Sequence, residues 1–429
     1  MGRGYSEIEK QIMDDNSRFE DKRDIMENTF PVQRPIRLLT AILVCTANIT
    51  FLKIGPVSAS FFIGLLLISL VYSKFPNYIR VEKDMMPFII LNALSFIGLL
   101  LSPVTFDGSS FFTSIQLVYW FLIANIISNV SPVIKDKLFI KAVLAAMFVI
   151  GLIFMYKRGE EALLSENESS FIVVVLWPIG FLLFKKWTRL VYIFLAFFLL
   201  FLIGSRSGLL IMVIQLVGFY LIKKLESKSM MRLLLFFLVG YFLISNSNVR
   251  LFIAERVFPD DKDMQMVIET PEIALQMDKS WVQRRIQQEK CKQVAENYPI
   301  LGIGPLNLVR YNFDINVSKI DVDSRVLANQ YGRSEQRSSH NAYFQLLAEN
   351  GFVGISLVLL AFVKLFYKYY KKRTEDDNCP ILMSSMIGLF INLFMVSGFW
   401  GTNTWLMLGL LSGYIRNNAT IDENTDSFE

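Results

Sequence analysis

The sequence predicts an all-α polytopic membrane protein with about twelve transmembrane helices and one large extracytoplasmic loop. Hydrophobic residues make up 53% of the 429 residues, and phenylalanine alone contributes 37. Apolar runs of about 15 to 20 residues recur along the chain, and each is long enough to cross a bilayer as a helix. The runs lack the ten-residue alternation of a membrane barrel. A soluble globular protein therefore does not fit.

The predicted spans follow one another from residue 36 to residue 416. They are 36–52, 56–73, 85–103, 113–131, 138–156, 170–184, 190–204, 207–222, 232–248, 341–368, 380–398 and 402–416. The short pairs around Pro56 and Ser205 also fit re-entrant segments. The predicted organisation is a cytoplasmic tail (1–35), nine spans (36–248), an extracytoplasmic loop (249–339), three spans (340–416) and a second cytoplasmic tail (417–429).

The N-terminal tail and the cysteines give little information about function. The first 34 residues are densely charged with both signs and lack the apolar core of a signal peptide, so we expect them to be retained. Cys45, Cys291 and Cys379 lie far apart, which predicts neither a disulfide framework nor a zinc set. We expect no metal, no cofactor and no nucleic-acid partner.

Basic residues set the predicted orientation. With the N-terminus inside, fifteen lysines and arginines fall in short inner loops and four in short outer loops. The inner set is Lys74, Arg80, Lys83, Lys135, Lys137, Lys185, Lys186, Arg189, Lys223, Lys224, Lys228, Arg232, Lys371, Lys372 and Arg373, and the outer set is Lys53, Lys157, Arg158 and Arg206. Both termini are therefore expected to be cytoplasmic and the 249–339 segment extracytoplasmic.

The outer segment balances its charges. It holds 13 basic and 13 acidic residues, so it is no general trap for polyanions. A helix is predicted over 272–297, because Pro271 suits a helix start and Asn297-Tyr298-Pro299 ends it. A tight glycine turn, Ile300 to Pro305, follows.

His340 is the only histidine in the chain. Histidine is the side chain most easily made an acid or base near neutral pH, so any histidine chemistry is here. It lies where the polar loop meets an apolar span. A polar residue that merely caps a membrane helix fits the position equally well.

Two arginines suit an anionic substrate. An extracytoplasmic site has no nucleotide pool, so a synthetic reaction there needs a donor that arrives already activated, such as a lipid-linked diphosphate sugar. Guanidinium groups bind phosphate at two points. Arg206, in Gly204-Ser205-Arg206-Ser207-Gly208, lies between two apolar runs, where a charge is costly and by default functional. The alternative is an arginine that reaches to the lipid head groups.

The second candidate is Arg284, with Arg285 beside it. Arg284 lies three residues after Trp281 and seven before Cys291, on a partly polar helix face. Adjacent residues point about 100 degrees apart on a helix, so at most one of the two arginines faces a given site. An ordinary solvated helix face is the alternative.

Three motifs together resemble the O-antigen ligase and polymerase family. They are Ser205-Arg206-Ser207 opening an apolar run, Arg284 fourteen residues before Pro299-Ile300-Leu301-Gly302-Ile303-Gly304-Pro305, and His340-Asn341 followed by Leu346-Leu347, Glu349, Gly351 and Gly354. The matches cover roughly residues 190 to 400. The order of the three parts is more specific than any one part.

The resemblance implies a GT-C-like, metal-independent, inverting glycosyltransferase in the bacterial inner membrane, with its active site facing outward. Such an enzyme moves a glycan from an undecaprenyl-diphosphate-linked donor to a lipid-linked or lipid A core acceptor. It implies that Arg206 and Arg284 hold the diphosphate, that His340 deprotonates or orients the acceptor hydroxyl, and that Asn341, Arg285 and Ser205 are candidates for supporting roles.

The chain departs from the family pattern at two positions. Gln288 replaces a common aromatic residue, and Ser338 replaces a common second histidine, so mechanisms that need two histidines do not fit. Reading the motif as one helix puts Glu349 opposite His340, where it is expected to be structural, and puts Phe344, Leu347 and Gly351 on the histidine's face.

Two alternatives remain open from the sequence. A polymerase and a ligase break the same bond and differ only in acceptor, and we favour the polymerase. A transporter fits twelve spans, but the spans lack carboxylates clearly at mid-depth and divide nine to three, which gives no support for paired repeats.

Overall fold

The computed structural model describes residues 33–47, 53–54, 57–81, 83–156, 166–185, 187–224, 265, 279–311, 339–396 and 399–425. Within these ranges the protein is a bundle of α-helices with three short 3₁₀ turns and one two-stranded antiparallel hairpin, β1 (Lys53–Ile54) with β2 (Val57–Ser58). The 3₁₀ turns are η1 (Pro76–Ile79), η2 (Lys83–Met85) and η3 (Ser131–Lys135). The helices are α2 (Arg34–Ala47), α3 (Ala59–Lys74), α4 (Met86–Leu100), α5 (Gly108–Asn129), α6 (Lys137–Tyr156), α7 (Glu166–Phe181), α8 (Trp187–Ile203), α9 (Arg206–Lys224), α14 (Lys279–Asn297), α16 (Ala342–Lys372), α17 (Cys379–Asn392) and α18 (Thr402–Thr425).

Eleven of the twelve predicted spans coincide with helices in the described part of the chain. The remaining range, 232–248, lies outside the described residues, as does most of the predicted 249–339 loop. Among the described residues, three helical stretches are long and apolar enough to cross a membrane: Lys83–Leu100, Gly108–Asn129 and Ala342–Lys372. Five other apolar helices in these ranges are shorter, among them α8 and α17. The polar helix α14 ends at Asn297, where the sequence predicts an end, and α18 continues to Thr425, past the predicted end at residue 416.

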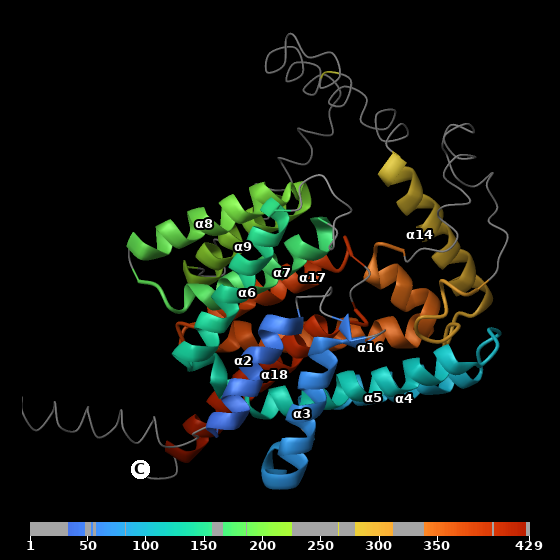
Figure 1. The fold of residues 1–429 in the computed structure, drawn as a ribbon, viewed down its shortest axis with the longest axis horizontal. Helices are drawn as coiled ribbons and strands as arrows, with labels where there is room; N and C mark the ends of the chain where they lie inside the picture. The colour runs from blue at the N-terminus through green and yellow to red at the C-terminus, as the bar shows by residue number, and fades with distance from the viewer. Residues whose placement is uncertain are drawn as a thin grey trace, which may run out of the picture.

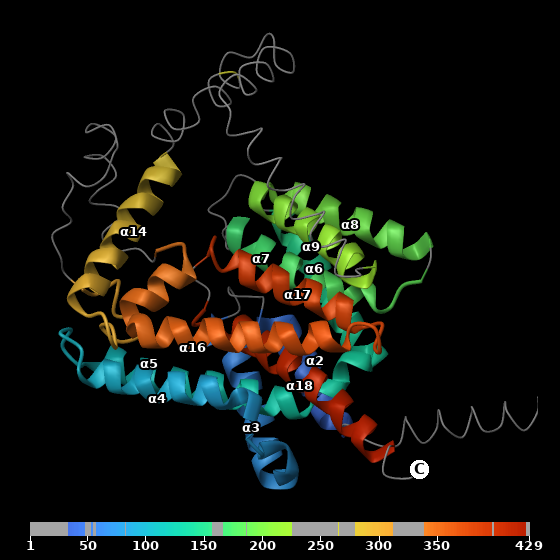
Figure 2. The same ribbon diagram turned by 180° about the vertical axis from the view of Figure 1, so that it is seen from behind.

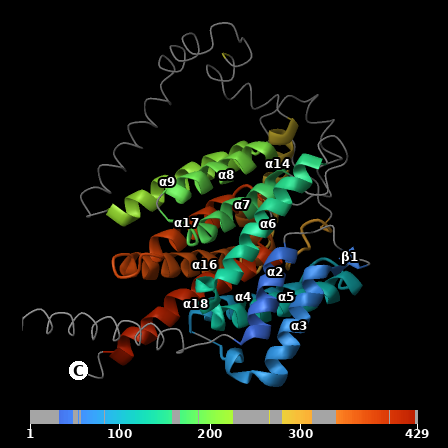
Figure 3. The ribbon, with the colours of Figure 1, turned by 60° about the vertical axis from the view of Figure 1, so that its left-hand side comes forward.

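The helices form two groups with α16 and α18 between them (Figures 1 and 3). One group holds α6, α7, α8, α9 and α17, and the other holds α2, α3, α4 and α5. Helix α18 packs mainly on α5, and α17 packs on α7 and α9. Helix α14 lies apart from both groups, beside the first part of α16 (Figure 2). The amino-terminal end of α16 is called the His340 end of the bundle below.

Small residues let α5 and α18 approach closely. A Cβ atom at Gly409 would lie 2.4 Å from the Ala124 carbonyl oxygen, and one at Gly413 would lie 1.9 Å from that of Ser128. These two glycines, four residues apart, form the small-xxx-small pattern by which membrane helices pack backbone to backbone. The contact places the central helix α18 firmly against the group of helices that contains α5.

Helix α16 bends sharply at Gly351, which the sequence analysis does not anticipate in its single 341–368 span. Gly351 has a φ of 63° and a ψ of −169°, outside the helical region. A residue with a side chain adopts such a φ only at a cost, so glycine suits the break. The bend divides α16 into a short segment of nine residues, 342–350, and a long segment, 352–372, that crosses the bundle.

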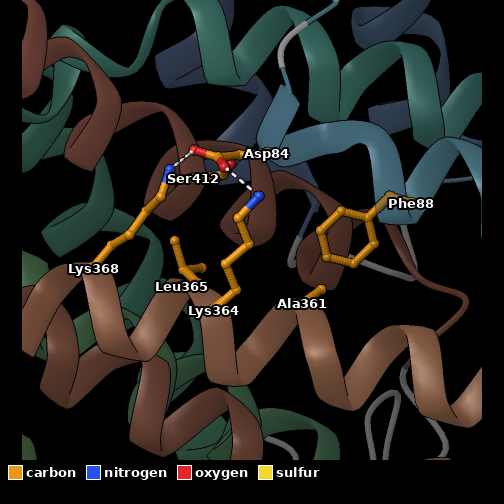
Figure 4. A pocket seen from close by; sticks show the side chains of 7 residues that line it. All are labelled: Asp84, Phe88, Ala361, Lys364, Leu365, Lys368 and Ser412. Carbon is orange, nitrogen blue, oxygen red and sulfur yellow. Dashed lines mark hydrogen bonds and ion pairs between the residues drawn. The ribbon is translucent and has the colours of Figure 1, made fainter.

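An ion-pair cluster joins α16 to the start of α4 at the end of the bundle opposite His340. Asp84, in η2, accepts hydrogen bonds from Lys368 and pairs with Lys364 at 3.2 Å. Figure 4 shows both ammonium groups directed at the one carboxylate, above Leu365 and beside Phe88. The two lysines lie one turn apart on α16, so a single carboxylate reaches both. The cluster fixes α4 against the long segment of α16.

Candidate active site

His340 lies in a strained turn immediately before α16. Its φ is 50°, in the left-handed region that few non-glycine residues adopt, histidine among the more frequent of them. The neighbouring hydroxyl of Ser339 holds the turn: it donates to the carbonyl of Asn341 at 2.6 Å and accepts from the N–H of Asn341 at 3.3 Å. Ser339 is fully buried, whereas His340 is partly exposed. The turn therefore presents the imidazole at the edge of the protein interior.

Asn341, and not His340, caps the helix. Its side-chain oxygen accepts from the N–H groups of Tyr343 and Phe344, at 3.0 and 3.2 Å. The N–H of Ala342 donates to Leu393 at 2.8 Å, and that of Gln345 donates to the carbonyl of Asn341. The first four N–H groups of α16, normally without partners, are thus all bonded. This helix start offers no spare donor for an anion, and the His340 side chain is not needed as its cap.

The helical-face interpretation of the motif is wrong, because His340 is not part of the helix. Its left-handed φ removes the register that put Glu349 opposite it and put Phe344, Leu347 and Gly351 on its side. Gly351 is the bend itself. Phe344 instead packs on a small core formed by α14 and the following turn, with Cys291 and Val294.

Ser205 and Arg206 open α9 after a tight turn. Gly204, with φ 78°, ends the preceding helix, and the Ser205 hydroxyl accepts from the N–H of Gly208 at 3.1 Å, as an N-cap does. Ser205 is buried and its hydroxyl lies 3.2 Å from that of Ser207. Arg206 is the first residue of the helix. Its side chain lies outside what the structure describes, but its backbone is at the mouth of the α8–α9 turn.

The buried side chain of Gln215 joins the middles of α7, α9 and α17. Gln215 on α9 donates to Val174 on α7 and to Ser384 on α17, at 2.9 and 2.7 Å. A Cβ at Gly208 would lie 2.9 Å from the Cβ of Ser170, so α9 and α7 begin side by side. Helix α17 runs the opposite way and ends beside these starts, because the loop that joins α16 to α17 lies at the other end of the bundle (Figure 2). Helix α16 begins at the same place, because the N–H of Ala342 donates to Leu393 just after α17. Arg206 and His340 therefore lie at one end of the bundle.

Helix α14 brings a second arginine toward the same end. Arg284 is half-buried, whereas Arg285 is exposed, in agreement with the prediction that the two point in different directions. Cys291, two turns further on and on the same face as Arg284, is fully buried. Burial raises the pKa of its thiol, and the hydroxyl of Ser339 lies within hydrogen-bonding reach. The face of α14 that carries Arg284 thus contacts the turn that carries His340.

The glycine turn after α14 docks on the bend of α16. The N–H groups of Ile303 and Gly304 donate to the carbonyls of Ala348 and Glu349 at 3.0 and 2.9 Å, and that of Phe352 donates to Pro299 at 2.8 Å. Hydrogen bonds that the bend removes from the helix are therefore replaced by the turn. The sequence predicts only a tight turn here. The paired glycines, both with positive φ, were the signal for close backbone contact.

Glu349 is a buried carboxylate that joins three segments of the chain. It accepts from the Gln345 amide at 2.9 Å and from the Trp400 indole N–H at 3.1 Å, and the backbone N–H groups of Leu306 and Leu308 also donate to it. The four donors come from α16, the segment after the glycine turn and the approach to α18. This network agrees with the expectation that Glu349 has a structural role.

Comparison with known families decides the assignment. Residues 191–359 match the family model described as O-antigen ligase, and this range contains Ser205, Arg206, Arg284, His340 and Asn341. This part of the chain is therefore similar to the O-antigen ligase and polymerase family. No curated protein matches the chain.

The match to the O-antigen ligase family supports a glycan-transfer role in O-antigen assembly, and the apolar helices support an integral membrane protein, as in proteins of that family. Such proteins use lipid-linked glycans as substrates, and lipid A core is their general acceptor. The matched range runs from α8 to the long segment of α16. The matched region thus includes the α8–α9 turn, α14 and the turn before α16, the three places where the candidate site residues lie.

Proposed function

We propose that this chain, whose residues 191–359 match the O-antigen ligase family, is an inverting, metal-independent glycosyltransferase. It takes the glycan from undecaprenyl diphosphate and joins it to an acceptor sugar hydroxyl at the outer face of the bacterial inner membrane. The observation that carries the proposal is the turn of His340. Its imidazole stands outside a fully bonded helix start, at the bundle end where Arg206 begins α9 and where the Arg284 face of α14 makes contact.

The proposed step is a single displacement. His340 takes the proton of the acceptor hydroxyl as its oxygen attacks the anomeric carbon of the donor sugar. The bond between that carbon and the diphosphate oxygen breaks, the configuration inverts, and undecaprenyl diphosphate leaves with the electron pair. Arg206 and Arg284 stabilise the charge that develops on the departing diphosphate. Asn341 and Ser205 support the site by capping the two helices that position these groups.

We favour repeat-unit polymerisation over ligation, because polymerisation occurs in bacteria with or without lipopolysaccharide. The family description, O-antigen ligase, supports the alternative in which lipid A core is the acceptor. The lipid-linked glycans of a strain that lacks this protein separate the two. Accumulation of single repeats indicates a polymerase, whereas accumulation of long chains on undecaprenyl diphosphate indicates a ligase. Transport is the distant alternative, and a flux assay in vesicles tests it.

A further inference from the structure

Helix α14 buries polar side chains on the face that contacts the His340 turn. Gln287 is 1% exposed and Lys290 is 3% exposed, although both belong to residue types that usually reach water. They share this face with the fully buried Cys291 and Val294. A helix outside the apolar spans needs no buried amide for its own stability, so the burial of Gln287 calls for a specific explanation.

The Gln287 amide lacks hydrogen bonds within the described part of the chain. Neither its nitrogen nor its oxygen has a partner there, although both atoms are shielded from solvent. Buried amides in folded proteins are normally satisfied on both atoms, because removing them from water without a partner is costly. By contrast, Gln293 on the same helix is partly exposed and donates to Glu289 at 3.3 Å. The Gln287 amide can therefore still donate and accept hydrogen bonds.

Gln287 lies on α14 between Arg284 and the residue that contacts the His340 turn. Gln287 comes one turn after Arg284 and one turn before Cys291, the residue whose thiol lies against Ser339. With a rise of about 1.5 Å per residue, it is roughly 5 Å along the axis from Arg284 and about 6 Å from Cys291. Along the axis of α14, Gln287 therefore lies between Arg284 and the contact with the His340 turn.

We propose that Gln287 is a substrate-positioning and specificity-determining residue that hydrogen-bonds the sugar attached directly to the donor diphosphate. The inference rests on the proposed function, in which Arg284 holds the diphosphate and His340 acts at the transferred sugar. An amide supplies two donors and an acceptor, which suits the hydroxyl and acylamino groups of a sugar and does not suit a phosphate alone. The bound sugar thus provides the partners that the amide lacks.

Binding of two lipids distinguishes a Gln287 contact with the sugar from a contact with the phosphate. Binding of undecaprenyl diphosphate, and of the undecaprenyl-diphosphate-linked repeat purified from the source strain, is measured on the detergent-purified full chain. Gln287→Leu is expected to weaken binding of the glycan-bearing lipid about 10- to 100-fold, the range for an unreplaced buried hydrogen bond, and to leave undecaprenyl diphosphate binding unchanged. Arg284→Ala weakens binding of both lipids. Gln293→Leu, the matched control on another face of α14, changes neither.

Thermal unfolding distinguishes a sugar-binding amide from a structural one. If the amide is reserved for ligand, Gln287→Leu removes two unsatisfied polar atoms and leaves the unfolding temperature unchanged or higher. A clear fall in that temperature, equal weakening of both lipids, or unchanged binding of both overturns the inference. These outcomes leave the proposed function standing as long as Arg284→Ala and His340→Asn still abolish transfer. Full transfer activity in those two variants instead refutes the proposed function.

Discussion

The carbonyl oxygen of Ala348, released from its helix by the bend at Gly351, accepts a hydrogen bond from the N–H of Ile303 at 3.0 Å. This bond links the segment that follows α14 to the helix that follows His340. Asn350 adds a second link, because its amide donates to Ser95 on α4 at 2.6 Å. The orientation of α14, and with it the placement of Arg284, therefore depends on the glycine turn.

Alanine at either glycine of this contact is expected to destabilise the protein. A Cβ at Gly302 lies 2.3 Å from the Glu349 carbonyl carbon, and one at Gly351 lies 2.2 Å from the Ile300 carbonyl oxygen, both on backbone with positive φ. Backbone strain alone costs about 1–3 kcal/mol, and the clashes add to it. Thermal unfolding in detergent measures the loss. Gly108→Ala is the control, since nothing lies within 4 Å of its Cβ position.

The glycine contact could not be derived from the sequence, although most of the fold could. Apolar length places eleven helices correctly, because the membrane requires every spanning backbone to bond internally. Length cannot reveal the bend at Gly351, since the lost helical bonds are replaced by residues about 50 positions earlier. The same limitation applies to His340: it lies next to Asn341, and only the backbone angles show which of the two caps the helix.

The two proposed diphosphate ligands are expected to be sensitive to geometry. Arg206→Lys keeps the charge but loses the forked pair of donors, so transfer should fall by about 10²-fold or more with normal membrane insertion. Arg284→Ala should be more damaging than Arg285→Ala, because Arg284 is half-buried and Arg285 is exposed. Purified transfer assays with matched protein levels check both. Equal losses at 284 and 285 would show that the outer helix presents a different face to the substrate.

Acid should weaken the ion pair between Asp107, in the loop that joins α4 to α5, and Arg310, in the segment after the glycine turn. The pKa of Asp107 lies below its ordinary value, first because the backbone N–H of Ser110 donates to it, with Arg310 adding attraction. Arg310 pairs with Asp107 at 2.7 Å and so holds the segment after the glycine turn. A carboxyl with a lowered pKa stabilises the fold above its unfolded pKa, and this contribution is lost as pH falls through the folded pKa. The unfolding temperatures of wild type and Asp107→Asn should therefore converge below about pH 4. A constant difference at all pH values contradicts this assignment.

The membrane orientation has its own test. A reporter fused near Val317, which lies outside the described residues, should be extracytoplasmic, and one fused after Arg373 should be cytoplasmic. The reason is the excess of lysine and arginine in the short inner loops. Alkaline phosphatase and fluorescent-protein fusions at both positions read the side directly. A cytoplasmic signal at residue 317 removes the basis for an outward-facing site.

The most direct test of the account is transfer by His340→Asn. Asparagine tolerates a positive φ, and Asn341 continues to cap α16, so this substitution removes the imidazole while it preserves the turn. Because the chain has no other histidine, no second imidazole replaces it. If His340 is the base, turnover of the purified variant falls by about 10²- to 10⁴-fold with an unchanged unfolding temperature, and its pH dependence flattens. Near-normal turnover contradicts the catalytic role of His340 and leaves the arginines and substrate positioning to account for the reaction.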